Sequence, residues 1–411
     1  MKKLIPAVIG LVAFTALLAA QGSAPRYKFD PDWPKQPLPN KWKMGGVTGL
    51  AVDKDDNVWV YDRPNDLRDM ELKAEIQPTI AECCARPPSM IHIDKNGSVI
   101  ESFDPPQGHG MAVDSKGFVY LGNSIKGLNT VRKYDPKSGK LLMEVPRIPE
   151  TQGGGGGGDE QPANRQPGRG TNGPVGTFPN VGGGRGAPNP QAQQAARDAA
   201  AAFQKKYPPG TPMIIDQIEE IRLDETAREL YAADAAYGGR VMIFDMDTFK
   251  FKRGWGAYGH PIDQIDPGPA AREYTPNGAF AKEFRGHLTL NFSSDGFVYA
   301  ADRAGNRIHV TDKQGKFVKE IPIAPFTTGG SAGGVMFSPD KQQQFIYVSD
   351  INNNHVWFVD RQSGKTVGSL GSLGENGGQF FGLHMIATDS KGNLYTGEVF
   401  NGERVQRFLK Q

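Results

Sequence analysis

The chain has 411 residues, and its 47 Lys and Arg against 45 Asp and Glu give a formal net charge of +2. A balance this close to neutral argues against a nucleic-acid partner, which needs a concentrated basic face. Two cysteines cannot form a framework of several disulfides. The length suits two ordinary domains or one large repeat array.

The N-terminus is typical of a secretory signal peptide. Lys2 and Lys3 precede an apolar run from Leu4 to Ala20, which is the order of charged and apolar regions in such peptides. The run is too short, and too closely followed by polar sequence, to span a membrane comfortably. We expect residues 1–20 to be removed after Ala20. The mature protein should then have no membrane span and be periplasmic or secreted.

One pattern recurs along the rest of the chain: an apolar strand, a turn with Asp, Gly or Asn, and a second strand that ends in an acidic residue or its equivalent. The alternation and the turn residues predict a β-hairpin for each copy. The six copies occupy 49–62, 110–123, 221–234, 288–302, 334–350 and 385–398.

Two further strands follow most copies, most clearly in 302–321 and 350–370. Four strands per copy predict the blade of a β-propeller, so six copies predict an all-β, six-bladed β-propeller that forms a single domain over 21–411. The segment 26–43 precedes the first copy. We expect it to supply an outer strand to blade six, which would close the ring and remove two free sheet edges.

Three insertions interrupt the blades, at 64–89, 146–212 and 257–281. The Gly-rich stretch 151–190 has too little apolar surface to order itself, so we expect it to lack regular structure. The Ala-rich stretch 192–207 can form a helix.

Cys83 and Cys84 are adjacent within the first insertion. In an exported protein they could form a vicinal disulfide, remain two free thiols or form an intermolecular bridge, and no third cysteine decides between these states. As a disulfide, the pair would form a small rigid platform beside a ligand.

Three of the seven histidines share one position of the repeat. His109 and His384 stand five residues before the Asp that ends the first strand of blades two and six, and His287 holds the equivalent place in blade four. Blades one, three and five have Thr48, Glu219 and Gly333 there. Because alternate blades of a six-fold ring are related by a third of a turn, the three imidazoles should converge at one mouth of the channel.

Three histidines around an open position are a common ligand set for a catalytic metal. Ligation by histidine alone suits zinc best, with copper, iron or nickel possible. The alternative is that the histidines only hydrogen-bond to water trapped at the channel mouth.

Other polar residues should open on the same face, in the loop after the second strand of each blade. These residues are Arg63 in blade one, Tyr237 in blade three and Arg303 in blade four. A guanidinium can hold a carboxylate by two parallel hydrogen bonds, and a tyrosine beside a dication can act as a base. Each arginine could instead be a solvated charge or one that staples its blade.

The segments around the histidines, RGHLTLNFSSDGFVYAADRAGNRIHV, QGHGMAVDSKGFVY and FGLHMIATDSKGNLYTGE, resemble peptidyl-α-hydroxyglycine α-amidating lyase. That family folds as a six-bladed propeller of the NHL-repeat kind and splits peptidyl-α-hydroxyglycine into a peptide amide and glyoxylate. The resemblance covers most of 43–411 outside the insertions. It implies that His109, His287 and His384 bind zinc, that Arg63 and Arg303 are the site arginines, and that Tyr237, displaced by one residue, is the catalytic tyrosine.

This chain also departs from that family. Met385 stands where the family has an acidic residue that supports a nearby calcium, so a calcium ion is not expected. The family's paired disulfides and an attached hydroxylating domain are absent from the sequence, and the Gly-rich insertion is foreign to the family.

The sequence therefore favours an exported zinc-dependent lyase that acts on a small-molecule or peptide carboxylate bearing an α-hydroxy amide. The alternative is a non-catalytic NHL propeller that binds a protein or glycan partner on its rim. A sugar-lactone hydrolase would instead need carboxylate ligands around calcium.

Overall fold

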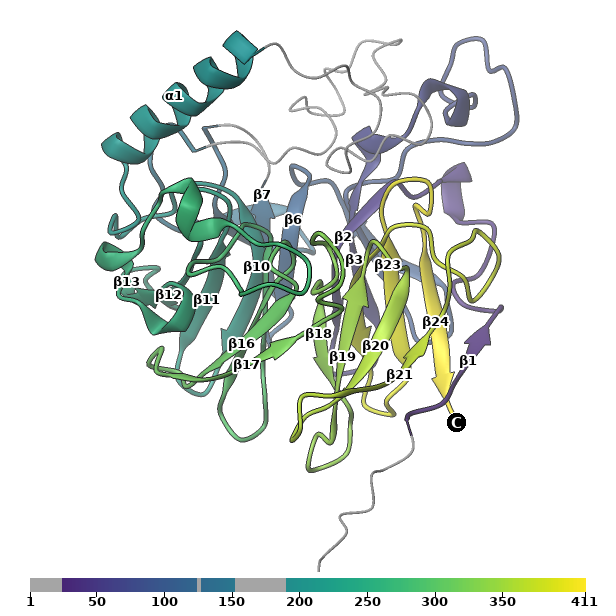
Figure 1. Ribbon diagram of the computed structural model, residues 1–411. Helices are drawn as coiled ribbons and strands as arrows, with labels where there is room; N and C mark the ends of the chain where they lie inside the picture. Colours follow the sequence, from purple (N-terminus) through teal and green to yellow (C-terminus); the bar gives the residue numbers. More distant parts are fainter. Residues whose placement is uncertain (1–23, 124–126, 152–189) are drawn as a thin grey trace, which may run out of the picture.

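In the computed structural model, which describes residues 24–123, 127–151 and 190–411, the chain forms six four-stranded antiparallel sheets arranged as blades around a central axis (Figure 1). The predicted all-β, six-bladed propeller is confirmed. The proposed signal peptide and residues 152–189 of the predicted irregular stretch lie outside the described residues.

The blades follow one another along the chain. Blade one contains β2 (Gly46–Val52), β3 (Val58–Arg63), β4 (Met90–Ile93) and β5 (Val99–Phe103); blade two contains β6 (Gly108–Val113), β7 (Val119–Asn123), β8 (Val131–Asp135) and β9 (Lys140–Glu144); blade three contains β10 (Ile218–Asp224), β11 (Glu229–Asp234), β12 (Arg240–Asp245) and β13 (Phe251–Trp255). Blade four contains β14 (Leu288–Phe292), β15 (Val298–Asp302), β16 (Arg307–Thr311) and β17 (Phe317–Pro322); blade five contains β18 (Val335–Phe337), β19 (Phe345–Asp350), β20 (His355–Asp360) and β21 (Thr366–Leu370). Each predicted hairpin coincides with the first two strands of a blade.

Blade six is completed by the start of the described chain. Its sheet has the order β1 (Tyr27–Asp30), β24 (Val405–Lys410), β23 (Leu394–Glu398) and β22 (Leu383–Thr388). β1 pairs antiparallel with β24, with Tyr27 opposite Lys410. The predicted closure is therefore confirmed, and it joins the two ends of the described chain in one sheet, which removes free edges from the ring.

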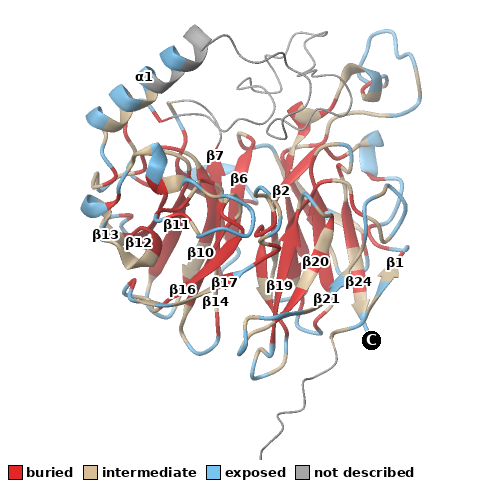
Figure 2. Cartoon of the chain, in the orientation of Figure 1, coloured by how far each residue is buried: buried red, intermediate tan, exposed pale blue. Residues whose placement is uncertain are grey.

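The first strands of the six blades form the inner wall. β2 contacts β6, β6 contacts β10, and the series continues through β14, β18 and β22 back to β2. Apolar clusters fill the spaces between neighbouring blades; one of them joins Val47 and Val60 of blade one to Met385 and Tyr395 of blade six. Figure 2 shows the inner and middle strands as mostly buried and the loops as more exposed.

The described parts of the insertions contain one α-helix and several short 3-10 helices, which are labelled η. These are η2 (Pro64–Asp66) and η3 (Asp69–Glu71) in the first insertion, α1 (Pro190–Lys206) in the second, and η5 (Ala257–Gly259), η6 (Ile262–Gln264) and η7 (Pro269–Arg272) in the third; η1 (Pro39–Lys41) precedes blade one. The 64–89 loop and α1 rise from the same end of the propeller (Figure 1). That end is the one at which β2 begins, because Gly46 at the start of β2 pairs with Arg63 at the end of β3.

The acid that ends the second strand is neutralised by an arginine in three blades. Asp234 pairs with Arg240 at 2.8 Å and Asp302 with Arg307 at 3.3 Å, and all four side chains are fully buried. Glu398 pairs with Arg404 in the same way in blade six. These pairs staple the loop before each blade to its second and third strands.

Asp62, which lies at the end of the second strand of blade one, has no arginine partner among the described residues. It is fully buried, and neither of its carboxylate oxygens has a hydrogen-bond partner among the described residues. Burial raises the pKa of Asp62 well above its usual range, and the nearby carboxylates of Asp66 and Glu403 raise it further. The backbone N–H of Gly45 and the positive charge of Lys43 oppose this rise of the pKa only in part. The N–H of Gly45 does not form a hydrogen bond with the carboxylate.

We expect Asp62→Asn to make the protein more stable than the wild type at pH 8. A carboxyl group whose pKa is higher in the folded state contributes stability below its unfolded pKa of about 3.9 and loses that contribution as the pH rises. The variant should therefore lose less stability than the wild type between pH 5 and pH 8, as measured by urea unfolding. Asp302→Asn is the matched control and should be less stable, because it breaks the pair with Arg307. A loss of stability in Asp62→Asn equal to that of the control would contradict the prediction.

Candidate functional site

Residues at the shared repeat position stand at β-bulges or at a strand start. The pairing of β2 with β3 skips Thr48, that of β10 with β11 skips Glu219, and that of β22 with β23 skips His384. The pairing of β6 with β7 skips His109 together with Gly110. A bulged residue leaves the ladder and its side chain is re-aimed, so these bulges are what allow the side chains to meet near the axis.

Gly110 allows blades two and three to approach each other at this level. Its φ is +76°, and a Cβ atom there would lie 2.8 Å from the Cα of Glu220 and 2.9 Å from the carbonyl of Glu219. Only glycine fits a position that combines this backbone conformation with such a close neighbour. The contact brings His109 next to Glu219.

His109 and His384 face each other across the ring. Their Nε2 atoms are 3.2 Å apart, and both residues are buried. The Nδ1 atom of His109 lies 2.7 Å from the carbonyl oxygen of Glu219, and that of His384 lies 3.1 Å from the carbonyl oxygen of Val47. A carbonyl oxygen only accepts, so each Nδ1 carries the hydrogen and each neutral ring has its lone pair on Nε2.

Burial keeps both rings neutral near pH 7. It lowers the pKa of His109 to about 4, with Glu219 opposing the shift, and it lowers that of His384 well below its usual value. The positive charges of Arg303 and Arg63 lower both pKa values further. Neutral imidazoles with a free Nε2 are the form in which histidine binds a metal.

His287 reaches this pair through Glu219. Its Nδ1 donates to Oε1 of Glu219 at 2.8 Å, and its side chain is 38% exposed. The same Oε1 accepts a hydrogen bond from Gln217. Oε2 of Glu219 lies 3.1 Å from Nε2 of His109. The structure therefore joins the three predicted histidines in one cluster, but through a carboxylate.

Glu219 is the site residue that the sequence interpretation missed. Its side chain is 1% exposed. Burial alone would raise the pKa of Glu219, but His109, His287 and Arg303 outweigh burial and hold it below its usual range. A signal for it was present: Glu219 occupies the shared repeat position in blade three, where a carboxylate would point to the same axis as the histidines.

The two arginines differ in how they are held. Arg63 binds Oδ2 of Asp66 through Nε at 2.9 Å and through an Nη atom at 2.7 Å. Arg303 is half-buried and makes no side-chain hydrogen bond or ion pair within the described residues, although its backbone N–H donates to the carbonyl of His287 at 3.0 Å. Burial lowers the pKa of Arg303, with Glu219 opposing and Arg63 reinforcing the shift. The positive charges of both arginines favour the binding of an anion at this mouth of the channel.

Tyr237 lies against the second insertion. Its ring packs on Phe203 of α1 with centroids 5.2 Å apart, and its backbone N–H donates to Asp216 at 2.7 Å. Burial and the charge of Asp216 raise the pKa of Tyr237. In the described part of the chain, no contact links its hydroxyl to the histidines or to Arg303.

The donor atoms at the mouth fit a metal in chemistry but are not yet gathered around one point. Among the described residues, no group of three or more His, Cys, Asp or Glu side chains is close enough to hold an ion without adjustment. Each of the three histidines nevertheless has Nδ1 fixed by an oxygen acceptor, which is the outer-shell arrangement found around metal-binding histidines. Met385 is buried in the cluster between blades one and six and provides no ligand for calcium.

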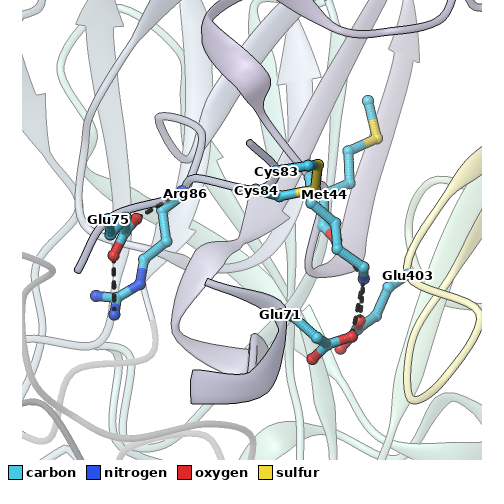
Figure 3. The surroundings of a disulfide bond; sticks show 8 residues. Met44, Glu71, Glu75, Cys83, Cys84, Arg86 and Glu403 are labelled. Carbon is cyan, nitrogen blue, oxygen red and sulfur yellow. Dashed lines mark hydrogen bonds and ion pairs between the residues drawn. A yellow bond between two sulfur atoms is a disulfide. The ribbon is translucent and has the colours of Figure 1, made fainter. Parts of the chain in front are cut away.

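Cys83 and Cys84 are joined by a disulfide bond in the 64–89 loop (Figure 3). The loop is tied down near this bond by Arg86, which pairs with Glu75 at 3.3 Å. Glu71 and Glu403 lie below the bond in the same view, and both pair with Lys43. The disulfide thus stands on the end of the propeller that carries the insertions.

Comparison with known proteins supports the architecture. No protein-family model matches the chain, and no curated protein does. Among solved structures, a Bacteroides thetaiotaomicron protein of unknown function is similar to it with a TM-score of 0.50 and 14% identity, over 90% of this chain and 70% of the other. An identity this low shows a shared fold alone.

Two structures of virginiamycin B lyase from Staphylococcus aureus match less well. A catalytically inactive variant with quinupristin has a TM-score of 0.44 and 11% identity, over 91% of this chain and 85% of the other. A selenomethionine-substituted form has a TM-score of 0.43 and 12% identity, over 89% of this chain and 86% of the other.

The class that fold and site define is a six-bladed propeller with three histidines at one mouth of its channel. No helix within the described residues is long and apolar enough to cross a membrane.

Proposed function

We propose that this chain is an exported, metal-dependent propeller enzyme, and that it is a zinc lyase acting on carboxylates that bear an α-hydroxy amide. One observation carries the proposal. His109, His287 and His384 each have Nδ1 held by an oxygen acceptor, which leaves Nε2 of each ring as the atom that can donate a lone pair to a metal. Three such rings at one channel mouth suit zinc with an open position for substrate.

His109, His287 and His384 would hold the zinc. When bound, zinc supplies a Lewis acid that polarises an oxygen of the substrate. Arg303 would bind the substrate carboxylate, because its half-buried guanidinium has no side-chain partner within the described residues. Arg63 would assist from beside it, although it must share its Nε and Nη donors with Asp66.

Tyr237 is the proposed base. With its pKa raised by burial and by Asp216, its phenol is protonated near pH 7 and can take a proton only after a nearby cation has lowered that pKa. Helix α1, which packs on its ring through Phe203, would set the position of the phenol. The disulfide of Cys83 and Cys84 would form a rigid platform at the same mouth.

A partner-binding propeller is the second candidate, and the first insertion favours it. Met70, Ile76 and Ile80 are large apolar side chains with exposed fractions of 67%, 39% and 65%. Their concentration in the 64–89 loop would suit a protein partner on the rim.

Protein purified without a histidine tag should contain about one zinc per chain by elemental analysis. It should also release glyoxylate from a peptidyl-α-hydroxyglycine. Zinc without glyoxylate release would reject this substrate class but retain the metal site. The absence of both would favour the partner-binding propeller.

A further inference from the structure

Two electron-pair donors lie beside Nε2 of His109 at the channel mouth. Nε2 of His109 lies 3.2 Å from Nε2 of His384 and 3.1 Å from Oε2 of Glu219. That Oε2 atom is buried and has no hydrogen-bond partner within the described residues. A buried carboxylate oxygen without a partner is costly, and it indicates a missing ligand or proton.

Both rings bond to backbone oxygens through Nδ1 and not through Nε2. Nδ1 of His109 and Nδ1 of His384 both donate to backbone carbonyl oxygens, and in the tautomer that these bonds select Nε2 carries the lone pair. A carboxylate oxygen is also an acceptor. The contact of Nε2 of His109 with Oε2 of Glu219 does not meet hydrogen-bond geometry. Contacts of 3.1–3.2 Å between acceptors are repulsive unless a cation lies between them.

The two separations from Nε2 of His109 are close to those of atoms that share a metal, although the three donors still have to shift to surround one point. Bonds of about 2.0–2.1 Å in a tetrahedron place neighbouring ligand atoms about 3.3–3.4 Å apart. The two observed distances lie close to this value. The role of Glu219 in positioning His287 does not account for the Oε2 atom left without a hydrogen-bond partner within the described residues, because Nδ1 of His287 is bound to the other carboxylate oxygen, Oε1.

We propose that Glu219 is a direct metal ligand through Oε2, beside His109 and His384, and that its Oε1 orients His287. The proposal rests on the metal site of the proposed function and deepens it. A carboxylate in the donor set makes the site less selective for zinc than three imidazoles, so it should also accept harder ions such as manganese(II) or iron(II).

The test is a titration of metal-free protein with Co²⁺, followed by its visible absorption. Glu219→Gln keeps an oxygen that can accept from His287 but removes the anionic ligand. We expect at least a ten-fold weaker Kd and a changed cobalt spectrum. Glu220→Gln is the matched control: this neighbour is also buried, but its carboxylate binds Arg222 at 2.8 Å, so cobalt binding should match the wild type.

A double-variant cycle separates direct ligation from an effect through His287. If Glu219 binds the metal, Glu219→Gln should weaken cobalt binding by a similar factor in a His287→Ala background. No further loss in that background would overturn the proposal, as would wild-type affinity and spectrum in Glu219→Gln alone. Either of these two results would reject Glu219 as a ligand without contradicting the proposed metal site. A wild type that binds no cobalt or zinc would reject the metal site and the Glu219 ligand together.

Discussion

Replacing His109 or His384 with Ala is expected to reduce bound metal well below one equivalent per chain. Each ring presents a neutral Nε2 to the other at 3.2 Å, and each is fixed by a backbone carbonyl. Removing one ring deletes one nitrogen donor of the proposed metal site. His287→Ala should also reduce the amount of bound metal, since the ring of His287 is hydrogen-bonded to Glu219 in the same cluster.

Metal content should be measured by elemental analysis after dialysis, with thermal unfolding as a check on folding. His355→Ala is the matched control. His355 begins β20, where its Nδ1 bonds to the carbonyl oxygen of Gly371, so this variant should keep the wild-type metal content. Unchanged metal in all three site variants would rule out the site.

Arg303→Lys is expected to retain zinc and thermal stability while weakening turnover of α-hydroxy-amide acids. Arg303 is neither a proposed ligand nor part of a stapling ion pair within the described residues. Lysine keeps the charge but loses the planar fork that can hold both oxygens of a carboxylate. The loss in kcat/KM should correspond to about 1–3 kcal/mol, the span for a charged hydrogen bond.

Arg307→Lys provides the contrast. Arg307 is fully buried, and it binds Asp302 and the carbonyl oxygens of Ala281 and Glu283. Its replacement should lower the unfolding temperature, because buried acceptors lose their donors. If Arg303→Lys behaves in the same way, or loses its metal, then Arg303 is a structural residue. If the wild type turns over no such acid, the lyase proposal fails.

The residue types around the mouth set what the site can bind. Asp66 pairs with Arg63 and Glu219 lies near Arg303, so two carboxylates balance the two arginines around His109 and His384, whose rings burial keeps neutral. A bound dication would therefore give the mouth a net positive charge. An anionic substrate therefore suits this mouth better than a neutral or cationic one.

Local sequence determined the blades. Alternating apolar residues and turn residues at Asp, Gly or Asn recur six times, and each hairpin depends only on neighbours a few residues away. Counting from the end of each first strand also placed His109, His287 and His384 on one ring, because blades of one fold repeat the same positions. The closing strand followed from the same logic, since an open ring would leave two edges unpaired.

Tertiary structure decided how the site is assembled. His109 and His384 are 275 residues apart in the chain, and Glu219 is 110 residues from His109. Their meeting depends on bulges at the start of β6, β10 and β22, which the repeat pattern does not reveal. A bulge changes the direction of one side chain without changing the alternation on either side of it, so periodicity alone cannot locate it.

The same limit applies to the partners of single side chains. Asp62 has the same place in its blade as Asp234 and Asp302, yet no arginine in the described part of blade one pairs with it, and its carboxylate has no hydrogen-bond partner among the described residues. Tyr237 was placed correctly after its strand, but its contact with Phe203 depends on where α1 packs. Repetition along the chain specifies which positions are equivalent, whereas the insertions and contacts between blades specify what each position meets.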